Sequence, residues 1–123
     1  KKMEFSYPWI NLEQCAVEEN VMLLPGSLFR KMADEVYAKA EAEPNIVYQI
    51  SGTRTGLACV AYNHGVMITL DHMIFNNVFA EQILPLSIGE KPMYTDLDLV
   101  YMKDTVLTKE IETLKNIMTE AIQ

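Results

Sequence analysis

Positive charge is scarce in this sequence. Among 123 residues there are 10 lysines and arginines against 17 aspartates and glutamates, and the formal net charge is -7. Only two of the cations are arginines, Arg30 and Arg54, and they stand far apart in the chain. Binding of nucleic acid needs clustered cations that replace the counterions of the phosphates. The residues given are therefore not expected to bind DNA on their own.

Long apolar runs and regularly spaced cysteines are also missing. No apolar run reaches the roughly 18 to 20 residues that cross a bilayer, and residues 1–5 lack the apolar stretch of a secretion signal. We therefore expect a cytoplasmic protein without membrane contact. The two cysteines, Cys15 and Cys59, lack the spacing of a metal site and are expected to pack in the core. The sequence predicts no metal and no other cofactor.

Signatures of catalysis are absent as well. There is no Gly-Lys-Ser or Gly-Lys-Thr phosphate loop and no Gly-x-Gly-x-x-Gly turn. No Gly-x-Ser-x-Gly elbow accompanies the neighbours Asp71 and His72, and adjacency in sequence does not make them a catalytic pair. We predict no catalytic residue and do not expect an enzyme.

What the chain does contain is a regular alternation of strand-like and helix-like segments, with half of its residues hydrophobic. The apolar patterns predict strands at 21–24, 46–50, 66–70 and 83–86, and helices at 28–40 behind Ser27, at 54–62, and at 72–79 behind Asp71. Parallel strands need crossovers, which helices usually supply. The fold class is therefore predicted as α/β, with a mostly parallel or mixed sheet flanked by helices.

The two ends of the chain follow other patterns. Asn11 is expected to cap a short helical turn, and Asn63 and Gly65 suit the left-handed end of the helix at 54–62. Residues 87–95 look like a connector, 96–102 like a strand, and Thr108 precedes a final helix. The apolar positions of that helix predict one buried stripe, made of Ile111, Leu114, Ile117, Met118, Ala121 and Ile122.

Three strand-to-helix junctions, at 25–27, 51–55 and 70–72, are candidate ligand sites. In open sheets of this kind, ligands bind beyond the carboxyl ends of the strands, where helix N-termini can hold an anion. The candidate side chains are Ser27, Ser51, Thr53 and Arg54, with Gly26 in the turn. Arg54 could pair with a carboxylate in a bidentate manner. The alternatives are plain helix caps for the hydroxyl residues and an exposed surface position for Arg54.

From about residue 9 onward, the order of features resembles the effector-binding domain of LysR-type transcriptional regulators. The strongest stretch runs through 44–51 and 57–68, which is similar to the strand, helix and Val-x-x-Gly-x-Gly-Ile turn of that family. Residues 24–30, 84–86 and 97–104 resemble further segments of it. Asn63 stands where the family usually has the first glycine of the turn, and Leu70 stands where a proline is common.

The resemblance implies a three-layer αβα architecture of the periplasmic-binding-protein-like type II. It also implies that the chain is a fragment, without the DNA-binding domain and the first part of subdomain I. Residues 1–16 would lead in from the crossover between subdomains, 17–86 would form subdomain II, 87–95 would connect, and 96–123 would supply the C-terminal strand and helix of subdomain I.

The function implied by the resemblance is that of a sensor. A small, often anionic metabolite would bind between two subdomains and change the arrangement of a dimer or tetramer on DNA, which a domain outside this chain would contact. By position, Ser51 matches a hydroxyl residue that contacts the effector, with Ser27 and Gly26 facing it, and Thr53 and Arg54 as further candidates. Affinity is expected to be poor without the other wall of the cleft.

Two other functions use the same architecture. One is a periplasmic-type solute receptor. The other is a domain like that of prephenate dehydratases, whose Thr-Arg-Phe motif is similar to residues 53–55. A surface used mainly for oligomerisation is a third alternative.

Overall fold

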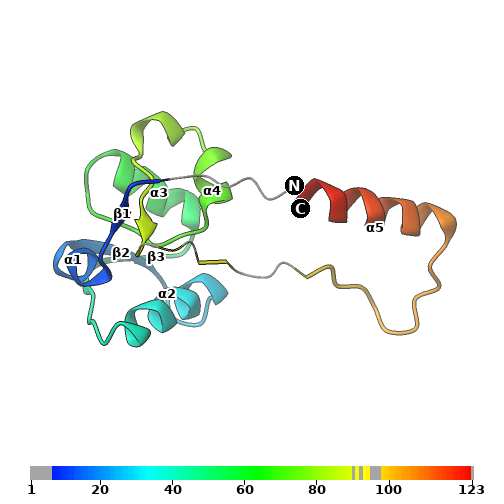
Figure 1. The fold of residues 1–123 in the computed structure, drawn as a ribbon, viewed down its shortest axis with the longest axis horizontal. Coiled ribbons are helices and arrows are strands. Elements are labelled where there is room, and N and C mark those ends of the chain that lie inside the picture. The colour runs from blue at the N-terminus through cyan, green and yellow to red at the C-terminus, as the bar shows by residue number, and fades with distance from the viewer. Residues whose placement is uncertain (1–6, 90, 92, 95–97, 123) are drawn as a thin grey trace. The chain divides into compact units, whose positions relative to one another are not determined.

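A computed structural model describes residues 7–89, 91, 93, 94 and 98–122 (Figure 1). By its contacts the chain divides into two compact units. One unit spans 7–92, and the other comprises the chain from residue 93 onward. The first unit holds the predicted strand–helix alternation and all candidate site residues.

In the first unit, short strands alternate with helices over most of the length. The elements are β1 (Trp9–Ile10), α1 (Leu12–Val17), β2 (Glu19–Leu23), α2 (Leu28–Lys39), β3 (Asn45–Ile50), α3 (Thr53–Ala61), α4 (Asp71–Phe75), the 3-10 helix η1 (Ala80–Gln82) and β4 (Ser87–Ile88). The predicted helices at 28–40 and 54–62 and the predicted strands at 21–24 and 46–50 are confirmed to within two residues. Asn63 has a positive φ of 62°, as predicted for the end of α3.

Parallel pairing organises both small sheets. β2 pairs with β3 over its whole length, so that Leu23 lies opposite Ile50, and the register shifts between Asn20 and Val21. On the other side of β2, Asn20 forms an isolated parallel bridge with Val66. β1 pairs with β4. Because every pairing is parallel, each needs a long crossover through helices.

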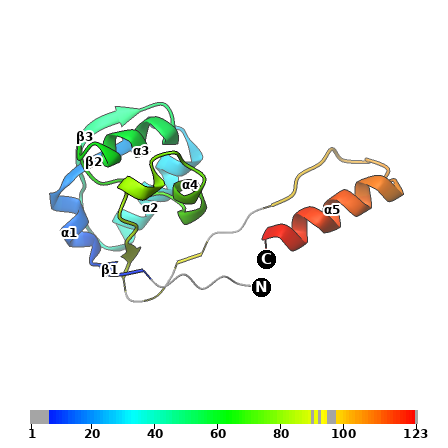
Figure 2. The same cartoon turned by 90° about the horizontal axis from the view of Figure 1, so that it is seen from above.

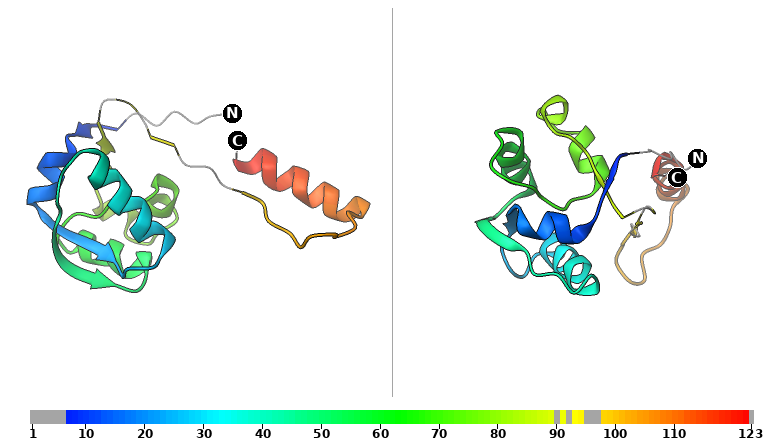
Figure 3. Two further views of the ribbon diagram at one scale, coloured as in Figure 1. Left: turned by 90° about the horizontal axis from the view of Figure 1, so that it is seen from below. Right: turned by 60° about the vertical axis from the view of Figure 1, so that its left-hand side comes forward.

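The helices lie on both sides of the β2–β3 pair. α3 and α4 lie in front of it in Figure 2, whereas α1 and α2 lie in front in the opposite view at the left of Figure 3. The core on the α1–α2 side consists of Leu12, Cys15, Ala16, Met22, Ala33 and Tyr37. Val21 and Met22 are both buried although they face opposite sides of β2. The predicted α/β class with helices on both faces is therefore confirmed.

A buried asparagine joins three elements of this core. Asn20 is 1% exposed, and its Nδ2 donates to the carbonyl oxygens of Cys15 and Glu18, both at 2.9 Å. Its Oδ1 accepts a hydrogen bond from the Tyr37 hydroxyl at 2.5 Å. Both ends of the amide are thus satisfied, as a buried polar group requires. Asn20 fixes the end of α1 and the last turn of α2 to the start of β2.

Ionisation of the Tyr37 hydroxyl makes the free energy of unfolding depend on pH in the alkaline range. Burial, and then the nearby Cys15 thiol, raise the pKa of Tyr37 to about 12 from its ordinary value of 10.0. The unfolded chain therefore loses this proton first, so the stabilisation is complete below pH 10.0 and declines as pH rises towards 12. Relative to Tyr37→Phe, the wild type should lose roughly 1 kcal/mol of unfolding free energy between pH 8 and pH 11, measured by urea unfolding. An identical loss in Tyr37→Phe would contradict this assignment.

Several predicted elements of the first unit are wrong. Residues 66–70 form no strand, because only Val66 pairs with β2. No strand forms at 83–86 either. β4 lies instead at Ser87–Ile88, inside the predicted connector, where the Ser87 N–H donates to the carbonyl of Pro8 at 2.8 Å. The helix predicted at 72–79 is short, and Asp71 is its first residue rather than its cap.

In the second unit, α5 (Lys109–Ile122) follows Thr108, whose Oγ1 accepts from the Ile111 N–H at 3.3 Å. The predicted strand is absent at 98–102, while residues 96 and 97 lie outside the described part. The predicted buried stripe is wrong for Ile111, Leu114, Ile117 and Met118, which are 41 to 58% exposed. The described residues of this unit supply no second element for the helix to pack against.

Candidate functional site

The junction between β2 and α2 is a tight turn closed by a helix cap. Gly26 has a φ of 99°, a conformation that side chains disfavour, which explains the glycine. Ser27 is the N-cap of α2, and its Oγ accepts from the Arg30 N–H at 3.1 Å. Its acceptor role is therefore structural, as the plain-cap alternative states, while its hydroxyl proton is left for another partner.

The junction between β3 and α3 leaves its polar side chains unengaged. The N-cap of α3 is Gly52, not a hydroxyl residue, and Thr53 is the first residue of the helix. Within the described part of the chain, Ser51, Thr53 and Arg54 make no side-chain hydrogen bond or ion pair. Ser51 and Arg54 are exposed. These three side chains can therefore meet a ligand without first breaking an internal contact.

Both junctions lie at one edge of the β2–β3 pair. Leu23 and Ile50 are opposite each other at the carboxyl ends of the strands, and the Leu24 N–H donates to the Ile50 carbonyl at 2.9 Å. Chain direction is the same in both strands, so the turns that follow begin side by side. This is the edge at which open parallel sheets bind ligands.

Two surface pockets flank this edge and divide the candidate residues between them. Gly26 and Ser27 line the first, and Thr53 and Arg54 line the second, whereas Ser51 lines neither. The remaining residues of the first pocket are Pro25, Leu28, Arg30, Lys31 and Asp34. The remaining residues of the second pocket are Leu57, His72, Met73, Asn76 and Asn77. The five candidates therefore share an edge but do not line one pocket.

Part of the second pocket was missed by sequence reasoning. His72 stands in the third junction, which the sequence points to, but Asn76 and Asn77 carry no periodic signal. The Asn76 amide donates to the His72 carbonyl at 3.0 Å, and Asn77 Oδ1 accepts from the Phe79 N–H at 2.8 Å. These bonds close the end of α4 and hold both amides beside the N-terminus of α3. The pocket thus combines one cation with hydroxyl, imidazole and amide groups.

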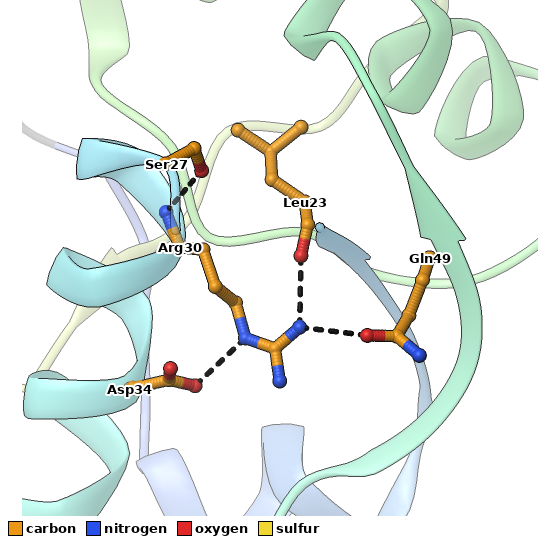
Figure 4. A network of polar contacts seen from close by, with 5 residues as sticks. All are labelled: Leu23, Ser27, Arg30, Asp34 and Gln49. Atoms are coloured by element: carbon orange, nitrogen blue, oxygen red, sulfur yellow. Dashed lines mark hydrogen bonds and ion pairs between the residues drawn. The ribbon is translucent and has the colours of Figure 1, made fainter. Parts of the chain in front are cut away.

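Arg30 was also missed, and it joins the two strand ends (Figure 4). Its side chain is 13% exposed and forms an ion pair with Asp34 through Nε at 3.0 Å. One Nη donates both to the Leu23 carbonyl at 2.8 Å and to Gln49 Oε1 at 3.0 Å. Sequence could not find this network, because its partners are separated by up to nineteen positions.

Cys15 takes the core position predicted for both cysteines, whereas Cys59 is only partly buried. Both are free thiols, and Cys15 is buried in the α1–α2 core. Burial, and then the nearby Glu18, raise the pKa of the Cys15 thiol, which opposes formation of a reactive thiolate. The described residues contain no cluster of three or more metal-ligating side chains. None of their helices has the length and apolar character of a membrane span.

Parallel strands with helices on both faces define an α/β domain, and polar side chains lie at the carboxyl edge of β2 and β3. The model of the family described as LysR substrate binding domain matches residues 7–123. The chain belongs to this family, whose members sense small-molecule effectors in transcription regulators. No curated protein and no solved structure matches the chain.

Proposed function

We propose that the chain is the effector-sensing part of a cytoplasmic LysR-type regulator and binds a small anionic metabolite at the carboxyl edge of β2 and β3. The observation that carries this proposal is the junction from β3 to α3. There Ser51, Thr53 and Arg54 keep unengaged donors beside the N-terminus of a nine-residue helix. A helix N-terminus and a guanidinium both favour a carboxylate or a phosphate.

Each further candidate has a stated part in this proposal. Ser27 and Gly26 lie at the neighbouring turn, where the hydroxyl proton of Ser27 is a second donor. The sensor performs no catalysis and needs no cofactor. It acts in a homo-oligomer, a dimer or a tetramer, and reaches DNA through a domain outside this chain.

An NMR titration tests the anion site while tolerating weak affinity. Succinate, benzoate and inorganic phosphate serve as probes, and the amides of Gly52, Thr53 and Arg54 report binding. Arg54→Gln should lower the affinity for the best probe roughly five- to tenfold, because it removes a charge-assisted hydrogen bond. Ser51→Ala should weaken it about threefold, as expected for a neutral hydrogen bond.

Lys39→Gln is the matched control, because Lys39 is an exposed cation in the last turn of α2 and lines neither pocket. It removes the same charge and should leave the affinity unchanged. Equal affinities in wild type, Arg54→Gln and Ser51→Ala would remove both residues from the site. Equal weakening by Lys39→Gln and Arg54→Gln would show that the effect comes from net charge alone.

A further inference from the structure

Arg30 contacts both strand ends that lead into the candidate site, although it lines only the first pocket. Through one Nη it reaches the carbonyl of Leu23, which is the last residue of β2. The same nitrogen reaches Gln49, the residue before the end of β3. Of these two partners, Leu23 lies three positions before Gly26, and Gln49 lies two positions before Ser51.

The orientation of the guanidinium is fixed from its own helix. Asp34, one turn further along α2, accepts from Nε at 3.0 Å. Guanidinium is planar and presents donors in fixed directions, so one bond at Nε sets the direction of the bonds at Nη. A lysine ammonium could reach one of these acceptors as a point charge, but it cannot hold that fork.

We propose that Arg30 is a positioning residue, which holds the β2–α2 turn and the β3–α3 turn in one register by bridging Leu23, Gln49 and Asp34. Its contribution to ligand binding rests on the proposed function. Arg30 fixes where Ser51 and Thr53 stand relative to Gly26 and Ser27 and does not itself meet the ligand at the second pocket.

Removing either Arg30 or Gln49 should increase local opening of the backbone at the ends of β2 and β3. The Leu24 amide, which donates to the Ile50 carbonyl at this edge, is the probe. Arg30→Met and Gln49→Leu should each speed its hydrogen exchange roughly three- to tenfold. That factor corresponds to the loss of one or two net hydrogen bonds. The Val21 amide, which donates to Val66 at 2.9 Å, is the internal reference for global stability. Exchange at Val21 should stay constant in Gln49→Leu, whose side chain is exposed.

Arg30→Lys and Lys31→Met separate positioning from charge and from helix stability. Arg30→Lys keeps the charge beside Asp34 but should restore at most part of the Leu24 protection that Arg30→Met removes, because the ammonium can reach only one of the acceptors. Lys31→Met, the next residue of the same helix, should match the wild type. Adding Gln49→Leu to Arg30→Met should speed exchange no further, because both changes remove one bridge.

Two results would overturn the proposal. One is equal acceleration at Leu24 and Val21 in every variant, which is the signature of a purely global loss of stability. The other is full restoration of Leu24 protection by Arg30→Lys. All these measurements use the protein without ligand, so they stand even if no anion binds. If succinate, benzoate or phosphate does bind, Gln49→Leu should lower the affinity for that probe about threefold. An unchanged affinity would show that Arg30 orders the strand ends only, and would refute its role in the site.

Discussion

Gly65→Ala should lower the free energy of unfolding of the first unit by roughly 4 kcal/mol, because it combines a strained backbone with a steric conflict. Gly65 has a φ of 128°, which residues with a side chain rarely adopt. A Cβ at this position would collide with the carbonyl oxygen of Glu19 and would touch Val21. That same carbonyl accepts the Val66 N–H at 2.8 Å, so the collision would break the pairing that brings Val66 to β2. Urea unfolding followed by circular dichroism measures the loss.

Three other glycines separate the two causes. Gly89→Ala tests strain alone, since Gly89 has a φ of 73° and nothing lies within 4 Å of its added Cβ. Gly56→Ala tests crowding alone, because its Cβ would meet the side-chain ends of Met67 and Ile50. Gly52→Ala has neither problem and should cost only the roughly 0.5 to 1 kcal/mol by which alanine is poorer than glycine at a helix N-cap. A loss in Gly65→Ala no larger than in Gly89→Ala would show that the Glu19 carbonyl moves aside freely.

Asn20→Leu should cost roughly 3 to 5 kcal/mol of unfolding free energy, because buried polar partners lose their hydrogen bonds. Leucine has a similar shape but cannot accept from the Tyr37 hydroxyl or donate to the carbonyls of Cys15 and Glu18. The end of α1 would then detach from β2 first. Chemical unfolding gives the total cost, and hydrogen exchange of the Glu18 amide, which donates to the Cys15 carbonyl, reports that end of α1.

Asn45→Leu is the control for this substitution. Asn45 is exposed at the start of β3 and makes no side-chain hydrogen bond within the described residues. It should change stability by less than about 0.5 kcal/mol. If Asn20→Leu cost no more than Asn45→Leu, the buried network would be energetically neutral, and packing alone would secure α1.

The sequence correctly predicted the helices and strands that form where their own apolar pattern places them. The apolar run at 21–24, the wide apolar face behind Ser27 and the β-branched run at 46–50 each have one dominant period, and each forms as expected. The runs at 66–70 and 83–86 are equally apolar, yet a strand also needs a neighbour with unpaired backbone groups. Only Val66 finds one on β2, and the partner of β1 proved to be Ser87–Ile88.

The candidate site was predictable to the same degree. Hydroxyl residues next to glycines mark the ends of strands, and parallel pairing brings 25–27 and 51–53 to one edge, as the order of elements predicts. The second pocket of that edge depends on α4 and on Asn76 and Asn77, which follow α4 and have no periodic pattern of their own. The Arg30 bridge joins side chains of α2 and β3 to a backbone carbonyl of β2, and no spacing within one segment encodes it.

The pairing of β1 with β4 determines when this part of the fold can form. The pairing consists of two residue pairs, Trp9 with Ser87 and Ile10 with Ile88, and nearly the whole unit lies between them in sequence. Ile10 and Ile88 also pack against the core, which forms from α1, β2 and α2. Closing so long a segment costs chain entropy that two pairs cannot offset by themselves. β2, β3 and their helices must therefore assemble first and bring the two ends together. We therefore expect this pair to be the last part of the unit to form and the first to open.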